Sequence, residues 1–175
     1  MPRGAGSSPD MEAGRLGLKF ETAQGETMRF ILVGLIVLPF IASPVVAADA
    51  ATQEANKKTV LEFYEAGLNK KDFAAAAKFF GPRYIQHNPT APDGIEGFKA
   101  FIGFLREKFP DSRSEIKRAF ADGDYVILHV HSVREKDTRG RAIVDIFRLE
   151  NGKIVEHWDV VQEIPEKAAN TNGMF

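Results

Sequence analysis

Four segments rich in apolar residues follow one another between residues 113 and 163, and only short turns separate them. The first, residues 113–121, ends in the turn sequence ADGD, and KDTRG joins residues 125–135 to residues 141–149. The sequence ENG then leads into residues 153–163. Short turns of this kind connect neighbouring antiparallel strands. The second half of the chain is therefore predicted to form an antiparallel meander.

The residues before these strands have the spacing of amphipathic helices. Apolar residues recur at intervals of three and four over residues 51–68, and again over residues 94–109, where Pro110 closes the segment. A shorter helix is expected after Asp72, whose side chain can cap it, and Gly81-Pro82 would end it. Helices followed by an antiparallel sheet make an α+β fold. Three helices on one face of a strongly curved sheet would leave a deep concavity.

An apolar run, FILVGLIVLPFIASPVV, lies between Arg29 and the small residues AADA. A basic flank, an apolar segment and small residues before a cut are typical of a secretory signal peptide. We expect a signal peptide over residues 28–48, with cleavage after Ala48, and hence an exported protein, periplasmic or secreted, without a stable membrane anchor. The alternative is a retained transmembrane helix, which the short run and its two prolines disfavour.

The residues before Met28 are glycine-rich and polar. Because a signal peptide starts near its initiating methionine, we expect translation to begin at Met28 and residues 1–27 to be an extension outside the fold. The folded domain is then expected over residues 52–165. Residues 166–175 would form a C-terminal tail, since they lack apolar periodicity.

The composition excludes several classes of function. The chain has 23 Lys and Arg against 24 Asp and Glu, so there is no basic surplus to neutralise nucleic-acid phosphates. It has no cysteine, which excludes disulfides, thiol catalysis and cysteine-ligated metals. His, Asp and Glu remain as the candidate reactive groups.

Two histidines interrupt the apolar strand segment VILHVHSV. His129 and His131 are two residues apart, so they point out of the same face of a strand. In the next predicted strand Asp145 shares a face with Ile143 and Phe147, which suits a cavity better than a core. If the two strands are neighbours, the histidines could lie across from Asp145, with Cβ atoms about 5 Å apart.

The remaining polar residues are harder to place. The last strand has mixed faces, with His157 and Asp159 on one and Glu156 and Trp158 on the other, so alternation does not decide which face is inner. His87 precedes a proline turn and could form the rim of the cavity. A lone histidine on a strand is more often structural than catalytic, and His157 and Asp159 could simply decorate an edge strand.

Three motifs, YIQHNP, GFKAFI and VDIFRLENGKIVEHWDVVQEIP, resemble the SnoaL-like polyketide cyclase branch of the nuclear-transport-factor-2-like (NTF2-like) superfamily. The resemblance covers about residues 55–175. It implies an NTF2-like cone, in which a curved antiparallel β-sheet wraps around three N-terminal helices and a pocket opens at the mouth. It also implies dimerisation through the sheet, and we expect a homodimer.

The resemblance implies a chemistry as well. In the cyclases an aspartate on an inner strand abstracts a proton α to a carbonyl, and the enolate closes a ring by aldol addition without a cofactor. By motif position this aspartate corresponds to Asp145, and the neighbouring histidine to His131. The ligand would be a small apolar molecule bearing a carbonyl. The residues expected to line the pocket and bind substrate are His87, His129, Trp158, Tyr84 and Phe147.

A donor for the enolate oxygen has no assigned position in the sequence. Ketosteroid isomerase, in the same superfamily, pairs an aspartate base with a tyrosine in its oxyanion hole. The three tyrosines of the chain, Tyr64, Tyr84 and Tyr125, are the candidates for this role.

Three functions remain open from the sequence. The first is a lyase or isomerase that uses acid–base chemistry alone. The second is a ligand-binding module without catalysis, which would use the same pocket. The third is a zinc or iron site formed by His129, His131 and a carboxylate, although His-x-His is a weak signal and the resembling cyclases need no metal. Export also separates this chain from polyketide cyclases, which act on intermediates made in the cytoplasm.

Overall fold

The computed structural model describes residues 44–175, with side chains from residue 49 onward. The predicted N-terminal extension, and the predicted signal peptide up to residue 43, lie outside the described residues. In the described part of the chain, no helix combines the length and apolar character needed to cross a membrane.

The helical layer contains the three helices expected from the sequence, but Gly81-Pro82 do not close the second one, since they lie within the strand Phe80–Gln86. The layer consists of α1 (Pro44–Tyr64), the π-helical turn η1 (Glu65–Asn69), α2 (Phe73–Ala76), the short 3₁₀ turn η2 (Ala77–Phe79) and α3 (Gly94–Lys108). Asp72 caps α2 as predicted, because its Oδ1 accepts a hydrogen bond of 3.0 Å from the backbone N–H of Ala75. α3 ends at Lys108, two residues before Pro110, which cannot continue a helix.

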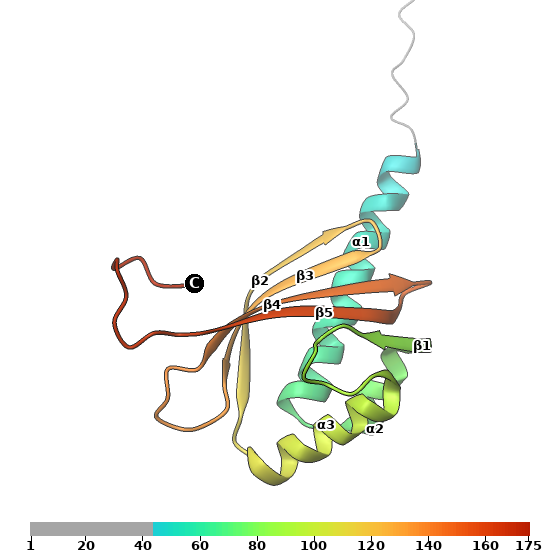
Figure 1. Cartoon of the computed structure of the whole chain (residues 1–175). Coiled ribbons are helices and arrows are strands. Elements are labelled where there is room, and N and C mark those ends of the chain that lie inside the picture. Colours follow the sequence, from blue (N-terminus) through green and yellow to red (C-terminus); the bar gives the residue numbers. More distant parts are fainter. Residues whose placement is uncertain (1–43) are drawn as a thin grey trace, which may run out of the picture. The chain divides into compact units, whose positions relative to one another are not determined.

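The sheet contains the predicted meander and one further strand. Its strands are β1 (Phe80–Gln86), β2 (Arg113–Asp122), β3 (Tyr125–Val133), β4 (Arg141–Glu150) and β5 (Lys153–Glu163). Within residues 44–175 the strand order is β1-β5-β4-β3-β2, with β1 parallel to β5 and the other neighbours antiparallel. The strands curve past α1 and α3 in Figure 1, which confirms the expected α+β architecture.

The core lies between the helices and the inner face of the sheet. Alternate residues of β3, namely Val126, Leu128 and Val130, are fully buried on this face. Phe63 of α1 is the centre of an aromatic cluster, with ring centroids 5.2 Å from Phe80, 5.2 Å from Phe98 and 5.8 Å from Phe147. The many phenylalanines of the helical half are thus explained by packing against the sheet.

The predicted inward orientation of His129 and His131 is wrong. In the register of β3 and β4, Leu128 is opposite Asp145 and His129 is opposite Val144. Ser132 likewise pairs with Arg141, so even-numbered residues of β3 lie beside odd-numbered residues of β4 on the same face of the sheet. The two histidines therefore lie on the face opposite to that of Asp145. The sequence pattern assigns residues to faces correctly within β3 and β4, whereas a bulge at Val155 breaks the alternation of β5. The pattern does not show which face of one strand lies on the same side of the sheet as a given face of the next strand, because this depends on the loop between them.

Candidate functional site

A cavity of about 820 Å³ lies between the inner face of the sheet, α1, α3 and the loop that follows β1. Aromatic side chains, including Phe98, Phe101 and Phe104 of α3, line much of it. The polar residues that line it include Asp145 of β4 and His157 of β5. A cavity of this size, mostly apolar and with a few polar groups that converge, is typical of sites for small organic ligands.

Asp145 and His157 form a buried pair at the wall of this cavity. Their side chains come from adjacent strands and are offset by two residues, since His157 lies opposite Phe147 in the register. His157 Nε2 lies 3.0 Å from Asp145 Oδ1, and the Tyr64 hydroxyl donates to Asp145 Oδ2 over 3.2 Å. Asp145 is 5% exposed and His157 is 8% exposed. Both carboxylate oxygens of Asp145 are therefore held by partners in a largely desolvated site.

The hydrogen bonds of Gln86 determine which ring nitrogen of His157 must carry a proton. Gln86 Oε1 accepts from the backbone N–H of Asn88 over 2.9 Å, so this atom is the amide oxygen. The same oxygen lies 3.0 Å from His157 Nδ1, which must therefore be the donor. The remaining proton lies between Nε2 and Asp145. The pair is either an imidazolium facing a carboxylate or a neutral imidazole facing a carboxylic acid.

Two tyrosines complete the polar end of the cavity. Burial, reinforced by the nearby Asp145, raises the pKa of Tyr64 well above its usual value, so its hydroxyl keeps the proton that it donates to Asp145. Burial likewise raises the pKa of Tyr84. The Tyr84 oxygen accepts from Gln86 Nε2 over 3.0 Å, which leaves its own proton free for a ligand in the cavity.

Asp159 fixes the loop that closes one side of the cavity. Both of its oxygens accept from Asn88 Nδ2, at 2.7 and 2.8 Å. Asn88 Oδ1 accepts in turn from the backbone N–H and the hydroxyl of Thr90, both at 2.7 Å. The loop after β1 is therefore tied to β5 by an Asp–Asn pair whose amide orientation is determined by the surrounding donors.

The same region offers a set of metal-ligand atoms different from the predicted one. Asp145, His157 and Asp159 each present one such atom, and these atoms lie within 4.8 Å of one another. A carboxylate–imidazole set suits several divalent cations, and Gln86 would orient the ring of His157 from behind. The predicted set of His129, His131 and a carboxylate at Asp145 does not assemble, because the histidines lie on the opposite face of the sheet.

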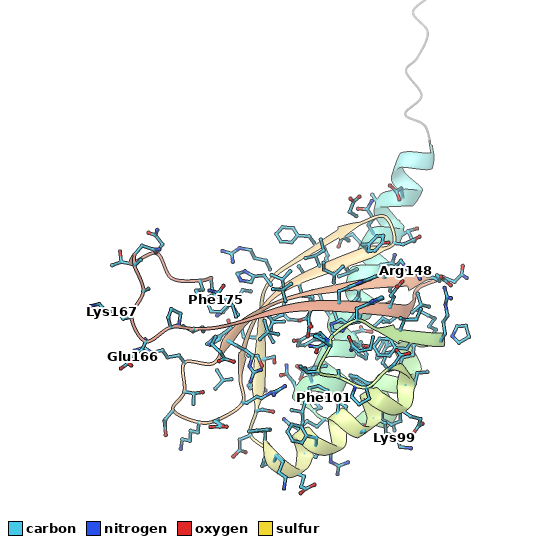
Figure 2. All side chains as sticks on the ribbon, viewed as in Figure 1. Lys99, Phe101, Arg148, Glu166, Lys167 and Phe175 are labelled. Atoms are coloured by element: carbon cyan, nitrogen blue, oxygen red, sulfur yellow. The ribbon has the colours of Figure 1, made fainter. Side chains whose placement is uncertain are left out.

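Of the residues predicted for the site, Asp145, Tyr84 and Phe147 line the cavity. His131 and His129 lie outside it. His131 Nε2 donates to the carbonyl of Arg139 over 2.8 Å, and His129 Nδ1 is 3.0 Å from Arg118 Nη1. The ring of the C-terminal Phe175 covers both histidines, with centroid distances of 4.8 Å to His131 and 5.2 Å to His129. Figure 2 shows Phe175 at the end of the tail, next to the strands.

His87 and Trp158 also lie outside the cavity. Their rings stack on each other with centroids 4.5 Å apart and planes 5° apart. His87 Nε2 lies 2.8 Å from Glu156 Oε1, and this contact, together with Arg148, lowers the pKa of Glu156. These residues form a polar cluster on the outer side of β5, where they join the end of β1 to the sheet.

The sequence pattern named Tyr64 only as a possible oxyanion donor, left His157 as a possible edge residue and missed Gln86. The alternation of β5 groups His157 with Asp159 and Glu156 with Trp158, but it does not decide which group faces inward. Tyr64 also has the helical spacing of the buried residues of α1, yet nothing local indicates that a residue of α1 meets one of β4. Gln86 could be recognised only from the pairing of β1 with β5, which joins segments distant in the sequence.

Comparisons with known proteins agree with this architecture. The family model described as SnoaL-like polyketide cyclase matches residues 58–169. A search of the curated proteins gave no match. A SnoaL-like polyketide cyclase described as putative, from Jannaschia sp. CCS1, shares 23% identity over 62% of this chain and 86% of its own, with a TM-score of 0.52.

Two further solved structures share the fold. A polyketide cyclase described as putative, from Bacillus cereus ATCC 10987, has 22% identity over 61% of this chain and 74% of its own, with a TM-score of 0.55. AclR from Streptomyces galilaeus, described as a putative hydroxylase, has 22% identity over 63% of this chain and 81% of its own, with a TM-score of 0.54. These structures show the shared fold, and the family-model match, which spans most of the chain, shows that the chain belongs to the SnoaL-like polyketide cyclase family.

Proposed function

We propose that this protein is a small-molecule enzyme whose acid–base chemistry requires no cofactor. Asp145 removes a proton α to a carbonyl, and the resulting enolate either closes a ring by aldol addition or is protonated at another carbon. The observation that carries the proposal is the buried Asp145 at the cavity wall, held by His157 at 3.0 Å and by Tyr64 at 3.2 Å. A poorly solvated carboxylate in a fixed orientation suits a general base.

His157 takes the role that the sequence suggested for His131. When Nε2 carries the shared proton, the imidazolium stabilises Asp145 as an ionised carboxylate that can accept the substrate proton. The C–H electron pair then passes into the enolate, and the proton goes to Asp145. Gln86 keeps the ring of His157 in place through Nδ1. His157 thus positions and charges the base, and it can return the proton later in the reaction.

Tyr84 is the proposed donor for the enolate oxygen. Its proton is uncommitted because its oxygen is the acceptor of the Gln86 hydrogen bond, and burial raises its pKa. A neutral hydroxyl in a water-poor cavity stabilises a developing oxyanion more strongly than it would in water. The two acid–base groups and the donor therefore come from β4, β5 and β1, around one cavity.

The first test compares variants of Asp145 and His157, which lie at the cavity, with a variant of His131, which lies outside it. Hydrophobic carbonyl compounds that stabilise the protein against heat are incubated with it in D₂O, and exchange at the α carbon is followed by mass spectrometry. We expect Asp145→Asn to abolish exchange and His157→Gln to slow it at least about 100-fold. His131→Gln is the matched control and should retain wild-type exchange. Full exchange by a folded Asp145→Asn variant would eliminate the proposed base.

A ligand-binding module without catalysis would give a different result. It would bind the same compounds and leave them unchanged in product analysis, with no exchange at the α carbon above the rate in buffer. This outcome would retain the cavity as a binding site and reject the enzymatic proposal.

The Asp145, His157 and Asp159 cluster supports a second candidate, a metal-dependent enzyme. Binding of a cation would require His157 Nε2 to exchange its 3.0 Å contact with Asp145 for a metal bond. Elemental analysis of protein purified without an affinity tag tests this candidate. A stoichiometric metal that is lost in Asp159→Asn would favour it over the metal-free mechanism.

A further inference from the structure

The cavity that contains Asp145 is also lined by two arginines, Arg134 and Arg141. Arg141 belongs to the same strand as Asp145 and lies four residues before it, on the same face. With a rise of about 3.3 Å per residue, the two Cα atoms are about 13 Å apart. Arg134 follows the end of β3, next to the Ser132–Arg141 pair of the register. The arginines therefore stand at one end of the cavity, away from the Asp145–His157 pair.

Arg141 has an unsatisfied donor. Its Nε is buried and has no hydrogen-bond partner among the described residues. The nearest carboxylate oxygen, Glu163 Oε1, is 3.8 Å from Nε, and the Glu163 side chain is 74% exposed. A buried N–H without an acceptor is costly and uncommon in folded proteins. A ligand with an anionic oxygen would supply the missing acceptor.

Arg134 is held in the cavity wall by aromatic rings. Its guanidinium carbon lies 5.7 Å from the ring centre of Phe101 and 5.8 Å from that of Phe109. Figure 2 labels Phe101 on α3. Burial lowers the pKa of Arg134, and the like charge of Arg141 adds to this effect. The two rings contact the guanidinium, and its N–H groups have no hydrogen-bond partner among the described residues, so they are available to a ligand.

We propose that Arg134 and Arg141 bind the carboxylate of an elongated, amphipathic carboxylic acid whose apolar body fills the cavity. This proposal rests on the proposed function for one point only. This point is that the reacting carbonyl of the acid lies at Asp145 and His157. The carboxylate site itself depends on the arginines alone.

The charge at this end of the cavity favours a carboxylate over a phosphate monoester. The arginines lie near Glu163, and the hollow that they border is also lined by Glu135, Asp137 and Glu166, so a dianionic phosphate would meet more repulsion there than a singly charged carboxylate. A carboxylate carries one negative charge and has two oxygens in the plane that suits a guanidinium fork. Both arginines also border an open hollow formed by the β3–β4 connection, so the ionised end of the ligand would lie toward solvent.

Binding of decanoate to the full-length chain, measured by isothermal titration calorimetry, tests the site. Decanoate is about as long as the distance between the arginines and the Asp145–His157 pair. Methyl decanoate is the uncharged ester of the same acid and serves as the control ligand. We expect decanoate to bind at least about tenfold more tightly than the ester. Arg134→Gln and Arg141→Gln should each weaken decanoate about tenfold and leave the ester unaffected. Arg118→Gln, on the opposite face of the sheet, is the control and should change neither.

Several outcomes would overturn the proposal. They are equal affinity for acid and ester, no measurable binding of decanoate, and arginine variants that bind decanoate as the wild type does. Tighter binding of decyl phosphate would replace the carboxylate with a phosphate. If Arg141→Gln fails to fold, Arg141→Lys keeps the charge but loses the buried Nε donor, and it should still reduce the preference for the acid.

One variant distinguishes a failure of the carboxylate site from a failure of the proposed enzymatic function. Asp145→Asn should keep the affinity for decanoate, because the arginine end of the cavity is unchanged, while it abolishes α-carbon exchange. Loss of the acid preference with exchange intact would reject the carboxylate site alone. Retained acid preference in a protein that catalyses no exchange would reject the enzymatic proposal alone.

Discussion

At the scale of single residues, the site depends on how each polar atom in the cavity wall is satisfied. Asp145 has one partner on each oxygen, and His157 has one on each nitrogen. Tyr84 differs from them because it accepts a hydrogen bond and keeps a free proton. An unused donor in a buried polar network is the group most ready to meet a ligand. This is why Tyr84, and not Tyr64, is the candidate for stabilising an enolate.

Tyr84→Phe tests that assignment. The substitution removes the hydroxyl and preserves the ring that packs 4.5 Å from Phe80. We expect kcat for α-carbon exchange to fall about 100-fold with little change in KM, because the donor acts on charge that develops after binding. Tyr125→Phe on the outer face is the matched control and should keep wild-type kcat. An equal loss in both variants, or an effect on KM alone, would remove Tyr84 from the mechanism.

Sequence reasoning at this scale found the aspartate and missed its partner. Asp145 stands out because a carboxylate between Ile143 and Phe147 has no place in a core. His129 and His131 attracted attention for a similar reason, yet the face opposite them, Val126, Leu128 and Val130, is the better apolar face. The contact of Asp145 with Tyr64 joins residues far apart in the chain, and no local pattern encodes it.

At the scale of elements, the strands were predictable because their turns are encoded locally. The ENG turn between β4 and β5 places Asn151 and Gly152 at φ values of 52° and 71°, as a type I′ hairpin requires. The same local information ends α3 before Pro110 and caps α2 with Asp72. The parallel pairing of β1 with β5 was not predicted, because it depends on the path of the chain around the helices.

Two glycines of α3, Gly97 and Gly103, allow a test of how the loop after β1 is held in place. A Cβ at Gly97 would lie 2.3 Å from the carbonyl oxygen of Pro92, so Gly97→Ala must displace the loop after β1. We expect it to destabilise the protein by about 1–3 kcal/mol. Gly103, in the same helix, has no atom within 4 Å of such a Cβ, and Gly103→Ala should stabilise by up to about 1 kcal/mol.

Urea unfolding of both glycine variants measures these effects, and ligand affinity adds a second readout. The Gly97→Ala variant should bind cavity ligands more weakly even where it remains folded, because Asn88 to Pro92 line the cavity. If both substitutions had the same effect on the free energy of unfolding, the close approach of α3 to the loop would not be a constraint on this fold.

At the scale of the whole molecule, the two faces of the sheet have different roles. The inner face and the helices enclose the cavity, and the outer face carries His129, His131 and exposed apolar residues such as Val144. Homodimerisation through this outer face remains a prediction from the family resemblance. The α+β cone was predictable as a whole because helix periodicity, strand alternation and turn chemistry all indicate one architecture.

Export also belongs to this scale. The predicted cut after Ala48 falls in the first turns of α1, and the residues that follow it up to Ala55 are mostly exposed. Burial begins at Asn56, with 2% exposure, and the core begins at Val60. Cleavage at Ala48 would therefore leave the cavity and the core contacts of α1 intact.

Expression of the full chain in a bacterium with a secretory pathway, followed by intact-mass analysis of the exported fraction, checks this prediction. We expect a mature protein that begins at Asp49. Ala48→Arg should block the cut, since a signal peptidase needs a small residue at this position, whereas Ala51→Arg should be processed normally. Uncleaved protein in the cytoplasm would contradict the prediction. It would also restore access to intracellular intermediates, which an exported enzyme cannot reach, so the result bears directly on which carbonyl compounds are worth testing.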